Sequence, residues 1–405
     1  MTVNLNEATH LAAVKGIRLA AGASGIKKNN TIDLVLIEIS EGASCAAVFT
    51  QNRFRAAPVI IAEQHLSESS PRLLLINSGN ANAGTGESGY RNALLTCELA
   101  ADVLGCKKQQ VLPFSTGVIG ENLQVDCFEK SLPELVSQLG SDNWLMAAKG
   151  IMTTDTVPKG ITREIQIDEE TITITGIAKG SGMIKPNMAT MLSYIATDAK
   201  ISADLLTECL KTSVEYSFNS ITVDGDTSTN DSCVLLATGQ TDAAEIKKSS
   251  AGFSVFMQAL AEVMQTLAQS IIRDAEGITK FVEITVCNAV SYDDAKTVAY
   301  TVAHSPLVKT ALFASDPNWG RILAAVGRAE IDKIEVDQLS IYLDDVCIVE
   351  EGARAGSYTE AAGQRVMNES EIKITIDLAM GDCQATVWTS DLSYDYVKIN
   401  AEYRS

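Results

Sequence analysis

Short runs rich in valine, isoleucine and leucine recur along the chain, and many are bounded by glycine, proline, asparagine or serine. Runs of this length and composition predict strands. Residues 163–167 and 171–175 alternate between apolar and polar on either side of 168–170, which predicts a hairpin. The remaining predicted strands cover residues 33–39, 59–62, 73–76, 111–114, 234–237, 281–286, 340–343, 372–376 and 385–388.

Longer stretches have apolar residues at helical spacing and predict helices over residues 90–104, 203–216 and 255–272. Ser202 stands where an N-cap is expected for the second of these helices. Strands and helices are mixed along the whole chain, with no convincing internal repeat and no low-complexity linker. The pattern therefore predicts α/β or α+β layers.

The chain has 405 residues and a mass of 43.2 kDa, which exceeds the usual size of a single core and favours two domains. Hydrophobic residues make up 46% of it, enough to bury substantial cores. Its formal charge of −19 argues against nucleic acid or an anionic membrane as a partner, since both attract concentrated basic surfaces.

The first residues lack the charge pattern and apolar stretch of a secretory signal, and no later run is long enough to span a bilayer, so we expect a cytoplasmic protein. Nine cysteines without a Cys-x-x-Cys pair predict reduced thiols rather than a disulfide framework. His10, His65 and His304 are isolated from one another in sequence, which argues against zinc and Ser/His/Asp chemistry.

Residues 179–199 contain the most informative pattern in the chain. Gly180, Gly182 and Pro186 favour a loop, and the apolar residues that follow Thr190 predict a strand. A threonine hydroxyl at this junction could attack the carbonyl of Ala189, and hydrolysis of the resulting ester would give Thr190 a free α-amine. Such an amine has a pKa of roughly 7.7–8.0 and can serve as the base for its own hydroxyl.

From the hydrophobic pattern alone, the simpler interpretation is that Thr190 only begins a strand, where threonine is common. Other motifs bear on this choice. The Ala-Thr-Met-Leu run around Thr190 resembles the self-cleavage motif of the ornithine acetyltransferase (glutamate N-acetyltransferase) family of arginine biosynthesis. Six further segments resemble signatures of that family in the same order, namely residues 77–83, 115–120, 152–156, 222–226, 316–321 and 400–405.

The resemblance implies an αββα sandwich of the DmpA and ornithine acetyltransferase type with a second, smaller α/β domain. It also implies a self-cleaving enzyme that moves an acetyl group from N2-acetyl-L-ornithine to L-glutamate through an acetyl-Thr190 ester, in a ping-pong reaction. Residues 1–189 would form an α chain and residues 190–405 a β chain in two interwoven α/β domains. Two such pairs would form a heterotetramer, and no metal or organic cofactor is expected.

The same resemblance assigns roles to particular residues. Thr116 and Gly117 would stabilise the oxyanion of the tetrahedral intermediate, and the scissile bond would join Ala189 to Thr190. Substrate would contact Thr153, Lys179, Thr190, Glu276, Asn400 and Ser405. Taken singly, these residue types are more often strand ends, caps, surface charges or tail residues. Whether acetyl-CoA also serves as donor is left open by the sequence.

Two other functions remain compatible with the residues. A related amidase or aminopeptidase would pass the acyl group to water, and a non-enzymatic amino-acid-binding protein would stay uncut. Two further motifs are weak. Residues 84–89 match Gly-x-Gly-x-x-Gly but do not directly follow a strand, and residues 224–235 match only part of a calcium loop. We interpret the latter as a turn that shapes the site.

Overall fold

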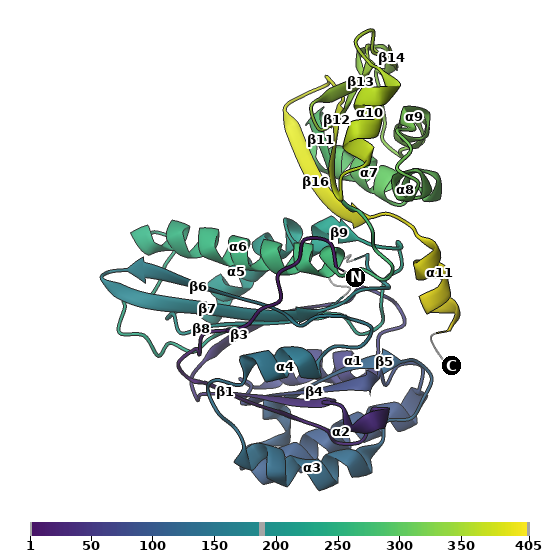
Figure 1. Cartoon of the computed structure of the whole chain (residues 1–405). Helices are drawn as coiled ribbons and strands as arrows, with labels where there is room; N and C mark the ends of the chain where they lie inside the picture. Colours follow the sequence, from purple (N-terminus) through teal and green to yellow (C-terminus); the bar gives the residue numbers. More distant parts are fainter. Residues whose placement is uncertain (1, 186–190, 403–405) are drawn as a thin grey trace.

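The computed structural model describes residues 2–185 and 191–402. The main body has four layers, in which two sheets lie face to face between two layers of helices (Figure 1). A smaller unit of sheet and helices is joined to one side of this body.

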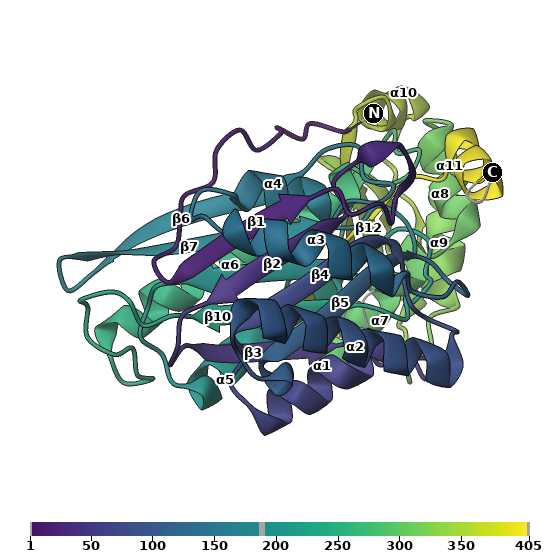
Figure 2. The same ribbon diagram turned by 90° about the horizontal axis from the view of Figure 1, so that it is seen from below.

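The first sheet has the strand order β1-β2-β4-β5, antiparallel except for the parallel pair β4 and β5. Figure 2 shows α2 and α3 across its outer face, and α1 packs beside β5. The elements are β1 (Ile17–Gly22), β2 (Leu34–Ile39), β4 (Leu73–Asn80), β5 (Val111–Val118), α1 (Ala57–Glu68), α2 (Gly86–Leu104) and α3 (Val125–Ser137).

The second sheet has the order β3-β10-β8-β7-β6, and α5 and α6 cover its outer face (Figure 1). The short helix α4 packs in the core between the two sheets. The elements are β3 (Ser44–Phe49), β6 (Lys159–Ile167), β7 (Glu170–Lys179), β8 (Leu192–Thr197), β10 (Ser232–Ala237), α4 (Trp144–Gly150), α5 (Ala203–Glu215) and α6 (Ala251–Arg273).

Strand β8 is central to this sheet, and every one of its residues is buried. Leu192 and Tyr194 point into the core between the sheets, whereas Ile195 packs with the helices of the outer layer. Because both faces of β8 are covered, its sequence is a nearly continuous apolar run rather than a strict alternation. The strand that begins just after Thr190 is therefore held firmly in the body of the protein.

The smaller unit contains a third sheet of order β14-β13-β12-β15-β11-β16-β9, with its own apolar core. The last helix, α11, leaves this unit and runs beside the main body (Figure 1). The elements are β9 (Ile221–Thr222), β11 (Phe281–Ala289), β12 (Ser340–Leu343), β13 (Val346–Glu350), β14 (Ala353–Arg354), β15 (Glu371–Asp377), β16 (Cys383–Ser390), α7 (Tyr292–Ala303), α8 (Pro306–Phe313), α9 (Trp319–Gly327), α10 (Glu360–Met367) and α11 (Tyr394–Ala401).

The structure confirms the expected αββα sandwich with a smaller α/β unit, the hairpin of β6 and β7, and the three predicted helices. The side chain of Ser202 caps α5 by accepting a hydrogen bond from the backbone N–H of Leu205. One predicted strand is wrong, because residues 59–62 belong to α1. Pro58 stands in the first turn of that helix, a position that favours helix initiation.

Within residues 2–185 and 191–402, no helix is long and apolar enough to cross a membrane. All nine cysteines lie in these ranges and are free thiols, as the sequence predicts.

Candidate active site

A pocket of about 250 Å³ opens where the two sheets of the main body meet the smaller unit's C-terminal helix. Six residues singled out from the sequence line it together, although they come from distant segments of the chain: Thr116, Gly117, Thr153, Lys179, Glu276 and Asn400. Ala189, Thr190 and Ser405 lie outside the described residues. Met191, to which Thr190 is bonded, also lines the pocket.

Gly117 is the last residue but one of β5 and cannot be replaced by a larger residue without a shift of the backbone. Its φ is +135°, and a Cβ built there would lie 2.3 Å from the carbonyl carbon of Gly79. The register of β4 against β5 also changes here, since Asn80 pairs with both Thr116 and Val118. This irregularity ends the regular strand at the pocket wall and leaves the backbone there close to the cavity.

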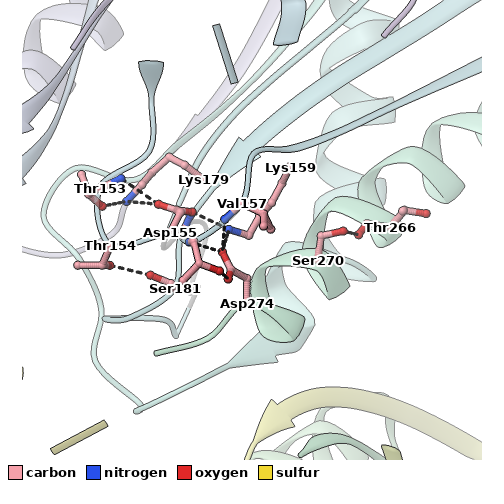
Figure 3. A network of polar contacts seen from close by, with 12 residues as sticks. Thr153, Thr154, Asp155, Val157, Lys159, Lys179, Ser181, Thr266, Ser270 and Asp274 are labelled. Atoms are coloured by element: carbon pink, nitrogen blue, oxygen red, sulfur yellow. Dashed lines mark hydrogen bonds and ion pairs between the residues drawn. The ribbon is translucent and has the colours of Figure 1, made fainter. Parts of the chain in front are cut away.

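A buried polar network supports the wall that carries Lys179 (Figure 3). The ammonium group of Lys159 lies 2.7 Å from Asp155 and 2.6 Å from Asp274, and all three side chains are fully buried. Asp155 also accepts hydrogen bonds from the backbone N–H groups of Gly180, at 2.7 Å, and Thr153, at 3.0 Å. Two neighbouring segments of the pocket are therefore fixed by one carboxylate.

These contacts set the charges of the network. Burial raises the pKa of Asp155, but Lys159, Lys179 and the hydrogen bonds outweigh it and hold that pKa well below its usual range. Burial lowers the pKa of Lys179, an effect that nearby Asp155 opposes and nearby Lys159 reinforces. The Lys179 ammonium donates to Thr153 Oγ1 at 2.7 Å and also lines the cavity, where it can meet a substrate carboxylate.

The opposite charge in the pocket comes from Glu276, which follows the C-terminal end of α6. Its backbone N–H donates to the carbonyl of Ser181 at 2.9 Å, and its carboxylate accepts from Nδ2 of Asn400 at 2.8 Å. A Cβ on Gly182 would lie 2.4 Å from this carboxylate, so a larger residue there would displace the Glu276 side chain. Asn400 belongs to α11, which confirms that the C-terminal segment reaches the pocket.

Asp224 shapes the loop that follows β7. Its carboxylate accepts from the backbone N–H groups of Met183, at 2.7 Å, and Ile184, at 2.9 Å, both of which line the pocket. The hydroxyl of Tyr396 on α11 donates to the same carboxylate at 3.1 Å. Asp224 begins the stretch of residues 224–235 that the sequence predicts as a turn shaping the site. In the described part of the chain, no cluster of metal-ligating side chains is found.

The family model described as "ArgJ family" matches residues 18–405. The chain belongs to the ArgJ family. The arginine biosynthesis bifunctional protein ArgJ of Pseudomonas fluorescens is 52% identical over 406 residues, covering 100% of both chains. The protein of the same name from Methylococcus capsulatus is 53% identical over 395 residues, covering 98% of this chain and 97% of that one.

A crystal structure of the arginine biosynthesis bifunctional protein argJ from Bacillus halodurans is 35% identical, with a TM-score of 0.51, and covers 53% of this chain and 100% of that chain. These matches confirm the family predicted from the sequence motifs. This member of the ArgJ family is an acetyltransferase-family enzyme of arginine biosynthesis, as the sequence predicts, so the alternative of a non-enzymatic binding protein is set aside.

Several residues of this ArgJ-family pocket carried no signal of their own in the sequence. Lys159 and Asp274 support the pocket wall from behind. Lys159 is four residues from Asp155 in the sequence, but only the fold brings Asp274 to this group. Asn230 donates from its side-chain amide to the carbonyls of Ala81, at 2.6 Å, and Ser115, at 2.9 Å, and so ties the second sheet to the first. A single buried polar or charged residue among polar and apolar neighbours produces no hydrophobic periodicity, so the sequence pattern could not reveal these contacts.

Proposed function

We propose that the chain is a self-cleaving acetyltransferase that moves the acetyl group of N2-acetyl-L-ornithine to L-glutamate through an ester on Thr190. The observation that carries this proposal is the convergence of Thr116, Gly117, Lys179 and Glu276 on one pocket whose wall includes Met191. Transfer of an acetyl group between two amino acids requires hydrogen-bond donors for the oxyanion, a cation for the carboxylate and an anion for the amine, and these residues supply all three.

Self-cleavage would begin with attack of the Thr190 hydroxyl on the carbonyl of Ala189, which breaks the peptide bond, forms an ester and frees the α-amine of Thr190. Water would then hydrolyse the ester, releasing the Ala189 carboxylate and restoring the Thr190 hydroxyl. That amine serves as the base for the hydroxyl in each later turnover. The arrangement of the second sheet supports a cut at this bond. Strands β6 and β7 precede residue 190 and β8 and β10 follow it, so hydrogen bonds between β7 and β8 would hold the two products together.

The described residues supply the remaining chemical roles. The hydroxyl of Thr116 and the backbone N–H of Gly117 stabilise the negative charge that develops on the acetyl oxygen. Lys179, with Thr153 beside it, binds the α-carboxylate that both substrates share. Glu276, with Asn400, binds an amide or ammonium nitrogen of the substrate. Ser405 would complete the substrate contacts from the end of the chain.

The proposed products are an α chain of residues 1–189 and a β chain of residues 190–405, associated as two pairs in the cytoplasm. The solved Bacillus halodurans chain is covered completely by 53% of this chain, the share expected if that polypeptide is one of two products. The relatives are named bifunctional, and we include acetyl-CoA as a second acetyl donor in the proposal on that ground.

The first test is the intact mass of the purified protein under denaturing conditions, with Thr190→Ala beside it. We expect two wild-type fragments that join at Ala189/Thr190 and one uncut chain for the variant. Thr197→Ala removes a threonine hydroxyl from the last residue of β8 and serves as the matched control, which should still be cut. An uncut wild-type chain that nevertheless transfers acetyl groups would contradict the cleavage mechanism.

A second measurement separates the acetyltransferase from the related amidase or aminopeptidase. The cleaved protein is mixed with N2-acetyl-L-ornithine in the absence and presence of L-glutamate, and the mass of the β chain and the products are followed. Acetylation of the β chain and its rapid loss to glutamate support the proposal. Loss of the acetyl group to water at the same rate with or without glutamate favours the hydrolase.

A further inference from the structure

Asp231 is an acidic residue of the pocket to which no role has been assigned above. It lines the same cavity as Lys179 and Glu276 and is only 4% exposed. It immediately precedes β10, and the backbone N–H of the next residue, Ser232, donates to the carbonyl of Met191 at 2.9 Å. Asp231 therefore lies alongside Met191 and the start of β8, which follow the proposed nucleophile in the sequence.

The carboxyl group of Asp231 is unusual in its surroundings. Within the described part of the chain, its Oδ2 atom is buried and has no hydrogen-bond partner. Almost all buried polar atoms in proteins have such a partner, and ionising a buried carboxyl group is costly when one of its oxygens has none. A buried acid that is left in this condition beside a reaction site is suited to carry a proton rather than a permanent charge.

The electrostatics allow both forms of this acid. Burial raises the pKa of Asp231 well above its usual range, while Ser228 and the ammonium of Lys179 act in the opposite direction. Lys179 comes from β7 across the sheet, and Glu276 is the other charged side chain that lines the cavity. The neutral acid is favoured by its buried position, and the carboxylate, once formed, has a cation near it.

The proposed reaction needs a group with these properties. The amide nitrogen of the donor is uncharged, but the α-amine of free ornithine is protonated near neutral pH. The first half-reaction therefore consumes one proton. Glutamate arrives with a protonated α-amine and leaves as an uncharged amide, so the second half-reaction releases one proton. In a ping-pong cycle the two events are separated in time.

We propose that Asp231 stores this proton between the two half-reactions, an inference that rests on the function proposed above. In the first half-reaction, the bond between acetyl carbon and nitrogen breaks and the ester bond to Thr190 forms. The departing nitrogen gains two protons, one from the Thr190 hydroxyl through the α-amine and one that Asp231 gives up. In the second, the ammonium group of glutamate loses one proton to the Asp231 carboxylate and one, through the α-amine, to the Thr190 oxygen, as its nitrogen bonds to the acetyl carbon and the ester bond breaks.

The test measures protons and ornithine together. Cleaved wild-type protein is mixed with N2-acetyl-L-ornithine at pH 7 without glutamate, in weak buffer with a pH indicator, while released ornithine and the mass of the β chain are followed. If Asp231 supplies the proton, the number of protons taken up from the solution for each ornithine released should be close to zero. Asp231→Asn cannot store a proton, and the solution should then lose close to one for each ornithine released.

Asp231→Ser provides a second neutral variant of smaller volume in case the amide disturbs folding. Asp226→Asn is the matched control, because it makes the same chemical change at an exposed position of the preceding loop. The control should behave as the wild type does. Uptake of about one proton by the wild type overturns the proposal, and so does uptake near zero in both wild type and the neutral variants. No acetylation of the wild-type β chain at all would instead refute the proposed function.

Discussion

The ammonium group of Lys179 donates a hydrogen bond to the hydroxyl oxygen of Thr153 at 2.7 Å. The same ammonium lies 3.9 Å from a carboxylate oxygen of Asp155, which is itself held by Lys159. Thr153 thus fixes the direction of Lys179, while the buried carboxylate stabilises its charge. A substrate carboxylate that enters the cavity meets a cation that is already oriented, which reduces the entropy lost on binding.

Thr153→Val removes this hydrogen bond with little change in volume. A hydrogen bond to a charged group contributes roughly 1.5–3 kcal/mol, so we expect kcat/KM for N2-acetyl-L-ornithine to fall about tenfold or more. Self-cleavage should still be complete. Thr207→Val, on the exposed side of α5, is the matched control and should leave the kinetics unchanged. Equal kinetics for both variants would show that Thr153 does not orient Lys179.

Lys159 forms ion pairs with two buried carboxylates, so its removal should affect stability more than that of any surface lysine. Lys159→Met leaves Asp155 and Asp274 buried without their cation, and breaking such a contact typically costs about 3–5 kcal/mol. The midpoint of denaturant unfolding should fall accordingly. Lys247→Met, which breaks an exposed ion pair with Glu245, should change the unfolding free energy by less than about 1 kcal/mol.

A triple variant separates charge from packing in that network. Lys159→Met combined with Asp155→Asn and Asp274→Asn removes all three charges and should unfold at a higher denaturant concentration than Lys159→Met alone. If the triple variant is no more stable than the single one, the loss comes from packing and the electrostatic explanation is wrong.

Thr116 and Gly117 should respond differently to substitution although both belong to the proposed oxyanion site. Thr116→Val removes one donor and should slow acetylation by about 100–1000-fold at an unchanged unfolding midpoint. Gly117→Ala also forces the backbone away from Gly79, so activity and the unfolding midpoint should both fall. Gly120→Ala is the control, since φ is also positive there, at +87°, but the added Cβ meets nothing within 4 Å. It should cost little activity.

The sequence predicts the layers of this fold better than its polar contacts. Strand β8 and helix α6 are recognisable because their buried residues are apolar and continuous or periodic. Residues 59–62 show the limit of this approach, since four apolar residues fit a strand or a buried helix equally well and Pro58 decides for the helix.

The pocket residues were found through ordered motifs rather than through periodicity. Asp155 lies within one of those motifs, but its partners Lys159 and Asp274 do not, and nothing in the local sequence of Asp274 indicates that the end of α6 meets β6. The role proposed for Asp231 could not be predicted from the sequence either, because it depends on the burial of its side chain and on Lys179, which comes from another strand of the sheet. Contacts of this kind exist only once the layers are assembled.

His304 gives the last prediction. Its Nε2 lies 3.0 Å from the hydroxyl oxygen of Thr222, and that hydroxyl donates its own hydrogen to the carbonyl of Ile184 at 2.8 Å. Nε2 must therefore carry the hydrogen of the neutral ring. Burial, reinforced by Lys185, Lys309 and Arg328, lowers the pKa of His304 to about 4.

Because an unfolded histidine titrates near pH 6.5, the unfolded chain binds a proton at this residue more readily than the folded protein does, and the contribution of His304 to stability decreases as the pH falls from about 6.5 to about 4. The contribution of His304 to this loss is at most about 3 kcal/mol. His304→Gln should make the unfolding midpoint less dependent on pH within that window, whereas His10→Gln, at an exposed position, should not. The same slope in wild type and His304→Gln would mean that His304 is protonated without strain in the folded protein.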